Sequence, residues 1–144
     1  MSNSHQSKEL LAGGPQLLNP VSAKLSSELP GFPASKCIDG YKHIGALEHK
    51  NMCHTKGESH ETRPWLAIDY GTSVTVERVK IFNRDDCCGD RTRNVEVRVS
   101  NELPTSSSQM FSGGSLLGTF PGPASNGQNF EISGEKGFLL TLIC

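Results

Sequence analysis

The stretch Asn94-Val95-Glu96-Val97-Arg98-Val99-Ser100 decides the fold class of this chain. Its three valines alternate with polar or charged residues. Because successive side chains of a strand point to opposite faces, this alternation predicts a strand with one face on a core and one in water. Strands of this kind are typical of antiparallel sheets.

Short runs of similar character lie on both sides of this stretch, separated by turns rich in glycine, proline and serine. They are residues 65–70, 74–76, 78–82, 115–120, 130–132 and 138–143. Residues 103–129 are expected to be a loop tract around the run 115–120, and residues 34–38 to make one helical turn. No long amphipathic helix and no internal repeat occurs in the sequence. The pattern predicts an all-β fold, an antiparallel β-sandwich or jelly roll.

Length and composition narrow the classes of function. The chain has 144 residues, 35% of them hydrophobic, which suits one globular domain. Its net charge of −1 provides no field that would attract a nucleic acid. No apolar run approaches the roughly 20 residues of a membrane-spanning helix, so membrane insertion is not expected. We expect residues 1–9 to be a flexible lead-in and residues 10–144 a single domain.

The five cysteines indicate an oxidising compartment, and their odd number leaves at least one without an intramolecular partner. If the protein is secreted, its signal peptide lies outside this sequence. The cysteines are Cys37, Cys53, Cys87, Cys88 and Cys144.

The most informative loop runs from Asn83 to Arg91, between two expected strands. The adjacent Cys87 and Cys88 are interpreted as a disulfide between neighbours, a rigid and apolar platform. Two disulfides to other cysteines, or two reduced thiols, are the alternatives. Arg84 and Arg91 flank the pair and carry several N–H donors. Donors above an apolar platform suit a neutral polyol, although a lone arginine here would more often form a surface ion pair with a neighbouring aspartate.

The motif Arg84-x-Asp86-Cys87-Cys88-x-x-Arg91 resembles that of the F-type lectins, a family of fucose-binding lectins with a discoidin-like β-jelly roll and binding loops at one end. Cys53-His54-Thr55 and Pro64-Trp65-Leu66-Ala67-Ile68-Asp69 resemble the family as well, and so does the segment from Phe32 to Gly40. The resemblance extends from about residue 10 to residue 143.

The resemblance implies a role for each residue that matches the motif. His54, Arg84 and Arg91 would donate hydrogen bonds to L-fucose, and the Cys87–Cys88 disulfide would pack against the sugar ring. Asp86 would orient an arginine rather than contact the sugar. Tyr41, Ile44 and Leu47 are candidates for the pocket that takes the fucose methyl group.

The chain departs from the family pattern around the histidine, because His54 follows Cys53 directly and lies further from Arg84 than is usual. His60 is therefore the first alternative for the histidine role, followed by His49 and His43.

The resemblance also implies a cysteine pairing and a metal site. Cys53 would pair with Cys144, which leaves Cys37 over, although Cys37 could compete for Cys144.

The family also implies a structural calcium ion near the turn at Asp39, held by backbone oxygens of Lys36 and Tyr41 and by the Asp39 carboxylate. A further carboxylate of the family has no counterpart here, because the chain ends at Cys144. Zinc is a poor alternative, because the candidate ligands have no tight ligand spacing. Those candidates are Cys37, His43, His49, Cys53 and His54.

The sequence thus predicts a non-enzymatic, extracellular lectin that recognises terminal L-fucose on fucosylated glycans. Homo-oligomers would add avidity. Recognition between gametes and innate immune recognition are the roles that the resemblance implies. A discoidin-like adhesion module without a sugar site is one alternative. The other is a thiol hydrolase with Cys87 or Cys88 as nucleophile, which would require a reduced and activated cysteine.

Overall fold

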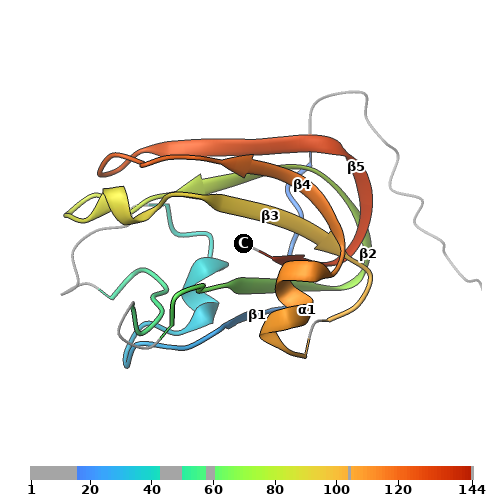
Figure 1. Cartoon of the computed structure of the whole chain (residues 1–144), viewed down its shortest axis with the longest axis horizontal. Helices are drawn as coiled ribbons and strands as arrows, with labels where there is room; N and C mark the ends of the chain where they lie inside the picture. The colour runs from blue at the N-terminus through green and yellow to red at the C-terminus, as the bar shows by residue number, and fades with distance from the viewer. Residues whose placement is uncertain (1–15, 43–49, 58–60, 104, 144) are drawn as a thin grey trace, which may run out of the picture.

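The structure, a computed structural model, describes residues 16–42, 50–57, 61–103 and 105–143, with the backbone alone for 135–143. Its strands form one antiparallel sheet in the order β1-β2-β5-β3-β4. The sheet curls so that the end of β2 and the start of β5 lie across the molecule from β1 and the start of β2 (Figure 1). The strands are β1 (Ser22–Leu25), β2 (Leu66–Phe82), β3 (Val95–Ser100), β4 (Ser115–Phe120) and β5 (Asn129–Ile143). The predicted antiparallel β-sandwich is confirmed.

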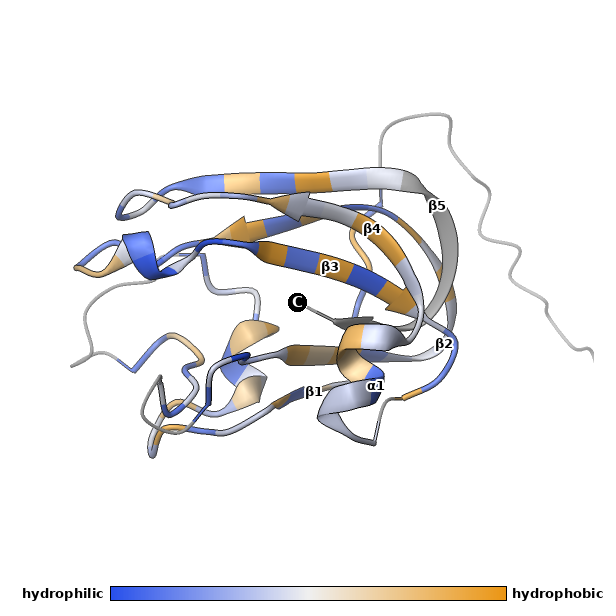
Figure 2. Ribbon diagram, in the orientation of Figure 1, coloured by the Kyte–Doolittle hydropathy of each residue, from blue (hydrophilic) through white to orange (hydrophobic). Residues whose placement is uncertain are grey.

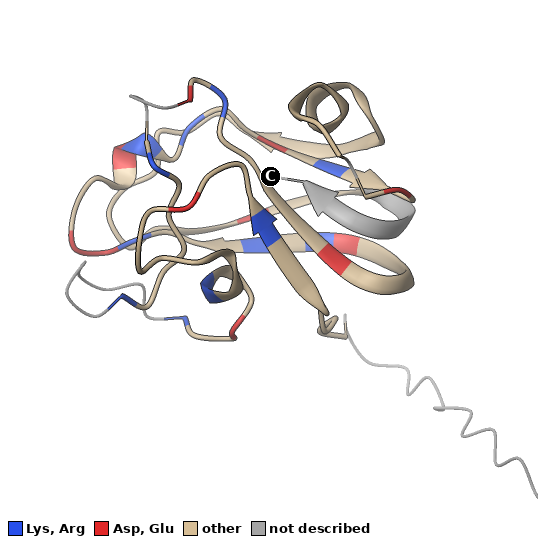
Figure 3. Ribbon diagram, turned by 90° about the horizontal axis from the view of Figure 1, so that it is seen from below, with Lys and Arg blue, Asp and Glu red and all other residues tan. Residues whose placement is uncertain are grey.

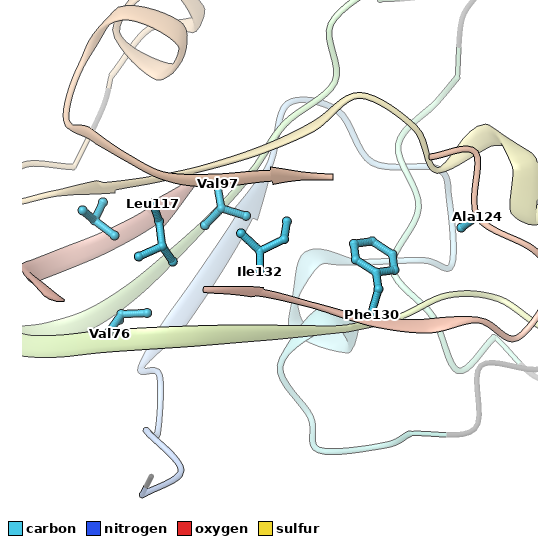
Figure 4. Packing of buried hydrophobic residues seen from close by; sticks show 7 residues of the cluster. Val76, Val97, Leu117, Ala124, Phe130 and Ile132 are labelled. Atoms are coloured by element: carbon cyan, nitrogen blue, oxygen red, sulfur yellow. The ribbon is translucent and has the colours of Figure 1, made fainter. Parts of the chain in front are cut away.

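The alternation that predicted β3 is visible along the strand (Figure 2). Val97 is fully buried and Val99 nearly so, while Glu96 is exposed. These valines meet side chains from β2, β4 and β5 in the larger of two hydrophobic clusters (Figure 4). The core consists of Val76, Val97, Val99, Leu117, Ala124, Phe130 and Ile132.

Two of the strands are longer than the sequence pattern predicted. Residues 66–82 form the continuous strand β2, with register shifts between Asp69 and Val74 and between Val76 and Arg78. Such bulges bend a strand without ending its pairing. The runs 130–132 and 138–143 likewise belong to one strand, β5. Bending of β2 and β5 allows a single sheet to supply both layers.

The short helices were predicted only in part. The 3-10 helix η1 (Ala34–Cys37) occupies the predicted helical turn. Helix α1 (Ser107–Ser112) lies in the tract that was expected to be loop. The sequence feature that marks the start of α1 is Ser106, the N-cap, whose hydroxyl accepts a hydrogen bond from the Gln109 N–H. Met110 of this helix is buried against Trp65 and Ala67, so α1 covers the start of β2.

No helix among the described residues is long and apolar enough to cross a membrane. Basic and acidic residues are interspersed along the described strands and loops (Figure 3).

Candidate functional site

The candidate site is the loop of residues 83–94, which connects β2 to β3 at one end of the sandwich (Figure 1). The loop of residues 121–128, between β4 and β5, lies beside it. Strand pairing continues into both loops, because the Asn83 N–H donates to the Gln128 carbonyl at 3.3 Å and the Gly127 N–H donates to the Arg84 carbonyl at 2.7 Å. The first residues of the loop therefore remain part of the sheet.

Asn83 is the side chain that holds the two loops together. It is 8% exposed, the one buried polar residue of the described chain. Its Nδ2 donates to the carbonyls of Gly89 and Ser125, both at 3.0 Å, and its Oδ1 accepts from the Thr92 hydroxyl at 2.8 Å. A buried amide with its groups satisfied in this way fixes the path of the chain around it.

A second contact between the loops is made at Gly89, in the 3-10 helix η3 (Gly89–Arg91). The Gly89 N–H donates to the Asn126 side-chain Oδ1 at 2.8 Å. A Cβ atom on Gly89 would lie 2.6 Å from the Asn126 nitrogen and 2.7 Å from the Ser125 oxygen. The glycine is thus required by the close approach of two backbones.

Arg84 is held in place by Asp86. Its Nε donates to Oδ1 at 2.7 Å and its Nη2 to Oδ2 at 2.6 Å, a bidentate pair in which the arginine side chain is only 11% exposed. The hydrogen bonds from Arg84 lower the pKa of Asp86 to about 2, and the same pairing raises the pKa of Arg84. Asp86 thus contacts the arginine that it was predicted to orient.

The Arg84–Asp86 pair is ionised throughout the physiological range. The pKa of Asp86 in the folded protein lies below the value of about 3.9 for an unperturbed aspartate. The contribution of the pair to stability is therefore complete above about pH 4 and is lost as the pH falls through about 2.

Cys87 and Cys88 form the predicted disulfide between neighbours. Cys88 has a φ of 59°, in the left-handed region, and its carbonyl accepts from the Arg91 N–H at 3.2 Å. The turn at Cys88 brings the chain directly into η3. Arg91 is exposed, and its side chain forms no hydrogen bond or ion pair with another described residue. Its guanidinium is therefore available to a ligand.

The predicted pairing of Cys53 with Cys144 is wrong, because Cys53 forms a disulfide with Cys37. The Cα atoms of Cys37 and Cys53 are 5.2 Å apart, inside the normal range for bridged cysteines. Cys37 is therefore not the unpaired residue, and this disulfide also removes both cysteines as zinc ligands. Cys144 itself lies outside the described residues.

His54 is held by the segment that precedes it. Its N–H donates to the Phe32 carbonyl at 3.2 Å, and its carbonyl accepts from the Leu29 N–H at 2.9 Å. The ring lies edge-on to Phe32, and Nδ1 is hydrogen-bonded to the Thr55 carbonyl. Within the described part of the chain, no hydrogen bond, ion pair or ring contact joins His54 to Arg84 or Arg91. Its role in binding stays a prediction.

The segment with Tyr41 lies next to the end of β2. The Lys42 ammonium is 5.9 Å from the centroid of the Phe82 ring, and Phe82 is separated from Arg84 by one residue. Tyr41 is 57% exposed. The two other residues predicted for the methyl pocket, Ile44 and Leu47, lie outside the described residues, as do the rival histidines 43, 49 and 60.

Lys36, Asp39 and Tyr41 fit a calcium site only in part. The Asp39 Oδ1 accepts from the Tyr41 N–H at 2.9 Å, and Oδ2 lies 3.8 Å from the Lys36 ammonium. Calcium requires six to eight oxygen ligands, and an ammonium beside the carboxylate opposes a cation. No group of three or more His, Cys, Asp or Glu residues that could hold a metal ion occurs in the described ranges. The ion stays a prediction.

The sequence pattern missed the three residues that fix the loop: Asn83, Gly89 and Asn126. One signal was present for Asn83. The inward positions of β2 run through Val79 and Ile81, so the next residue in phase is Asn83. A polar residue at an inward position must find buried partners. Nothing in the sequence indicated which backbone groups these partners would be.

The family model for the NedA-like, galactose-binding domain matches residues 36–134. The chain belongs to this family. It is 34% identical to Fucolectin-3 of Anguilla japonica over 83 residues, which cover 57% of this chain and 43% of that protein. The chain spans less than half the length of the curated relatives it matches.

Two solved structures share the fold. One is an f-lectin (fucolectin) from Morone saxatilis serum, with a TM-score of 0.72 and 24% identity over 85% of this chain and 40% of that one. The other is the lectin domain of lectinolysin complexed with Lewis B antigen, with a TM-score of 0.65 and 22% identity over 85% of this chain and 78% of that one. The resemblance to the F-type lectins is confirmed.

Proposed function

We propose that this chain is a non-enzymatic lectin domain that binds terminal L-fucose at the loop of residues 83–91. The observation that carries the proposal is the arrangement of Arg84, clamped by Asp86, beside the Cys87–Cys88 disulfide. An arginine fixed by one partner loses little conformational freedom when it binds a second. The loop is already ordered by Asn83, so a ligand meets a pre-organised site.

The chemistry of the site suits a 6-deoxy sugar. Asp86 engages Nε and one N–H of Nη2, so the rest of the five N–H donors of Arg84 are free for sugar oxygens. Arg91, three residues after Cys88, is exposed and adds further donors. The disulfide has no strong hydrogen-bonding group and offers an apolar surface to the C–H groups of the ring. Neither a nucleophile nor a bond to be broken is involved.

The alternative of a thiol hydrolase is not favoured. A catalytic cysteine must be a thiolate, whereas Cys87 and Cys88 are joined to each other and Cys37 to Cys53. The relatives and structural neighbours described above carry names of lectins. A reactive thiol at Cys87 or Cys88 in the native protein would contradict this part of the proposal.

A glycan array tests the proposed function. We expect binding to glycans that end in L-fucose and none to the same glycans after fucosidase treatment. A folded protein that binds none of the fucosylated glycans would contradict the proposal and favour an adhesion module without a sugar site. The Arg84→Ala variant, checked for its folded state, serves as the negative control because it removes donors and leaves the disulfide in place.

The setting of this activity forms part of the proposal. Two disulfides are typical of proteins that fold outside the cytosol, which supports a secreted or extracellular lectin. Its proposed role is recognition between gametes or innate immune recognition. Homo-oligomers would raise the avidity of a weak monosaccharide site. Mass determination by light scattering tests the oligomeric state, and immunolocalisation tests the extracellular setting.

A structural calcium ion at Lys36, Asp39 and Tyr41 is a separate proposal, supported by the exposed Asp39 carboxylate and the preference of calcium for oxygen ligands. Thermal unfolding with calcium and with a chelator tests it. A higher melting temperature in calcium would support the ion, and identical curves would remove it.

A further inference from the structure

Lys80, Phe82 and Arg84 lie on one face of the end of β2. Neighbouring residues of a strand point to opposite faces. Val79 and Ile81 pack against the core and Asn83 is buried, so the residues between them point outward. Since strand pairing continues as far as Arg84, the same alternation holds into the candidate site. The Phe82 side chain is thus the next outward neighbour of the arginine that is proposed to bind fucose.

Two ammonium groups lie near the Phe82 ring. The Lys80 Nζ lies 5.4 Å from the ring centroid and the Lys42 Nζ 5.9 Å from it. Lys42 comes from a distant part of the sequence, so the fold brings the two charges to one ring. An aromatic ring attracts cations to its face, which places both ammonium groups beside an apolar surface.

Neither of these lysines has an acidic partner within the described residues. The other cations near them do: Arg78 pairs with Glu131 at 3.5 Å, and Arg84 pairs with Asp86. Because the chain has a net charge of −1 and its charges are interspersed (Figure 3), the positive charge at Phe82 is a local feature. We call Lys42, Phe82 and Lys80 the Phe82 platform.

The spacing relates the platform to the sugar site. Residues two apart on a strand are separated by about 7 Å, so Phe82 lies about one sugar ring away from Arg84. A fucose held by Arg84 would direct the sugar to which it is linked along this face. The two ammonium groups beside Phe82 would accept a negative substituent on that sugar.

We infer that the Phe82 platform is a second subsite, which binds an anionic substituent on the sugar next to fucose. A sulfate ester and a carboxylate share the required chemistry. This inference rests on the proposed function, because it extends the same site from a neutral terminal sugar to an acidic glycan. Lysine acts here as a point charge, which requires no particular orientation of the anion.

The test compares three fucosylated oligosaccharides by calorimetry at low salt: a neutral one, its sulfated derivative and its sialylated derivative. We expect the wild-type protein to bind at least one acidic form about two- to fivefold more tightly per ammonium group engaged. The Lys42→Gln and Lys80→Gln variants should each lose part of this preference and the double variant all of it, with the affinity for the neutral form unchanged. A preference for the sulfated or for the sialylated form identifies the source of the anion.

Lys24→Gln is the matched control. The Lys24 ammonium lies 6.0 Å from the Trp65 ring centroid, so this change removes the same charge and the same kind of contact elsewhere. It should leave the preference intact. Equal binding of all three oligosaccharides by the wild-type protein would overturn the inference without contradicting the proposed fucose site. An equal loss in Lys24→Gln and in the double variant would overturn it too, whereas no binding of any of the three would overturn the proposed function.

Discussion

The two disulfides of this protein stabilise their surroundings in different ways. Cys37–Cys53 joins residues 16 apart in the sequence and so closes a covalent ring that includes the chain between them. Cys87–Cys88 joins neighbours and closes no loop of the chain. Order around the second disulfide comes instead from Asn83 and Asn126, which bind the loop of residues 83–94 to residues 121–128.

We interpret this difference as one between a structural cross-link and a disulfide with a proposed role in ligand binding. A disulfide stabilises mainly by restricting the unfolded chain, and the effect grows with the size of the closed loop. A disulfide between neighbours restricts almost nothing. Cys87–Cys88 is therefore expected to matter for binding and Cys37–Cys53 for stability.

The largest effect is expected at Asn83, the buried side chain that holds the loop of residues 83–94 against residues 121–128. Asn83→Asp keeps the shape of the side chain but places a carboxylate against two carbonyl oxygens in a buried position. We expect a loss of about 3–5 kcal/mol in the free energy of unfolding, as for other unpaired buried charges. Chemical denaturation measures it. The loss should shrink at low pH, where a protonated carboxyl group can again donate.

Asn126→Asp is the control for this change, because a carboxylate still accepts the hydrogen bond from the Gly89 N–H. This side chain is exposed, and we expect little change in stability. Comparable destabilisation by the two substitutions would contradict the role given to Asn83.

The next effect separates the two disulfides. Replacing Cys37 and Cys53 by serine should lower the free energy of unfolding by about 3 kcal/mol, the cost of opening a loop of this size. Replacing Cys87 and Cys88 by serine should change stability much less and abolish fucose binding. Chemical denaturation measures the stability of both variants, and calorimetry measures their fucose binding. A larger loss of stability in the Cys87/Cys88 variant, or a loss of fucose binding only in the Cys37/Cys53 variant, would contradict this division of roles.

A smaller effect is expected from the two arginines. Arg84→Ala and Arg91→Ala should each weaken fucose binding by about 1–3 kcal/mol, because sugar hydroxyls lose their donors. Calorimetry with L-fucose measures it. Arg93→Ala is a matched control, since Arg93 is exposed close to the same loop and has no assigned role. An unchanged affinity in both Arg84→Ala and Arg91→Ala would show that the site lies elsewhere.

The smallest effect is expected at Asp86. Asp86→Asn keeps one acceptor for Arg84 and removes the charge from the bidentate pair. The loss of a charge-assisted bond should weaken fucose binding by about two- to fivefold, less than the loss of either arginine. Calorimetry at neutral pH measures it. A loss as large as that in Arg84→Ala would indicate that Asp86 contacts the sugar directly.

Patterns with a strict local cause were predictable from the sequence. The alternation in β3 indicated its buried face, and the adjacent cysteines indicated their own pairing. Asp86 was matched to its arginine through the motif. Each of these features depends on residues that are close together in the chain.

Features that depend on distant contacts were not predictable. The family resemblance assigned the partner of Cys53 to the far end of the chain, and sequence spacing does not show that the Cα atoms of Cys37 and Cys53 lie 5.2 Å apart. The lengths of β2 and β5 depend on bulges that keep pairing through polar stretches. The attachment of Gly89 to residues 125 and 126 requires the fold itself.

The central claim is that the loop of residues 83–91 binds L-fucose. Titration of isotopically labelled protein with L-fucose, followed by NMR of the backbone amides, tests it most directly. We predict saturable shifts in residues 84–91 and none in the amides of β3, with D-glucose producing neither. Saturable shifts confined to another part of the molecule, or no shifts at all in a folded sample, would contradict the claim.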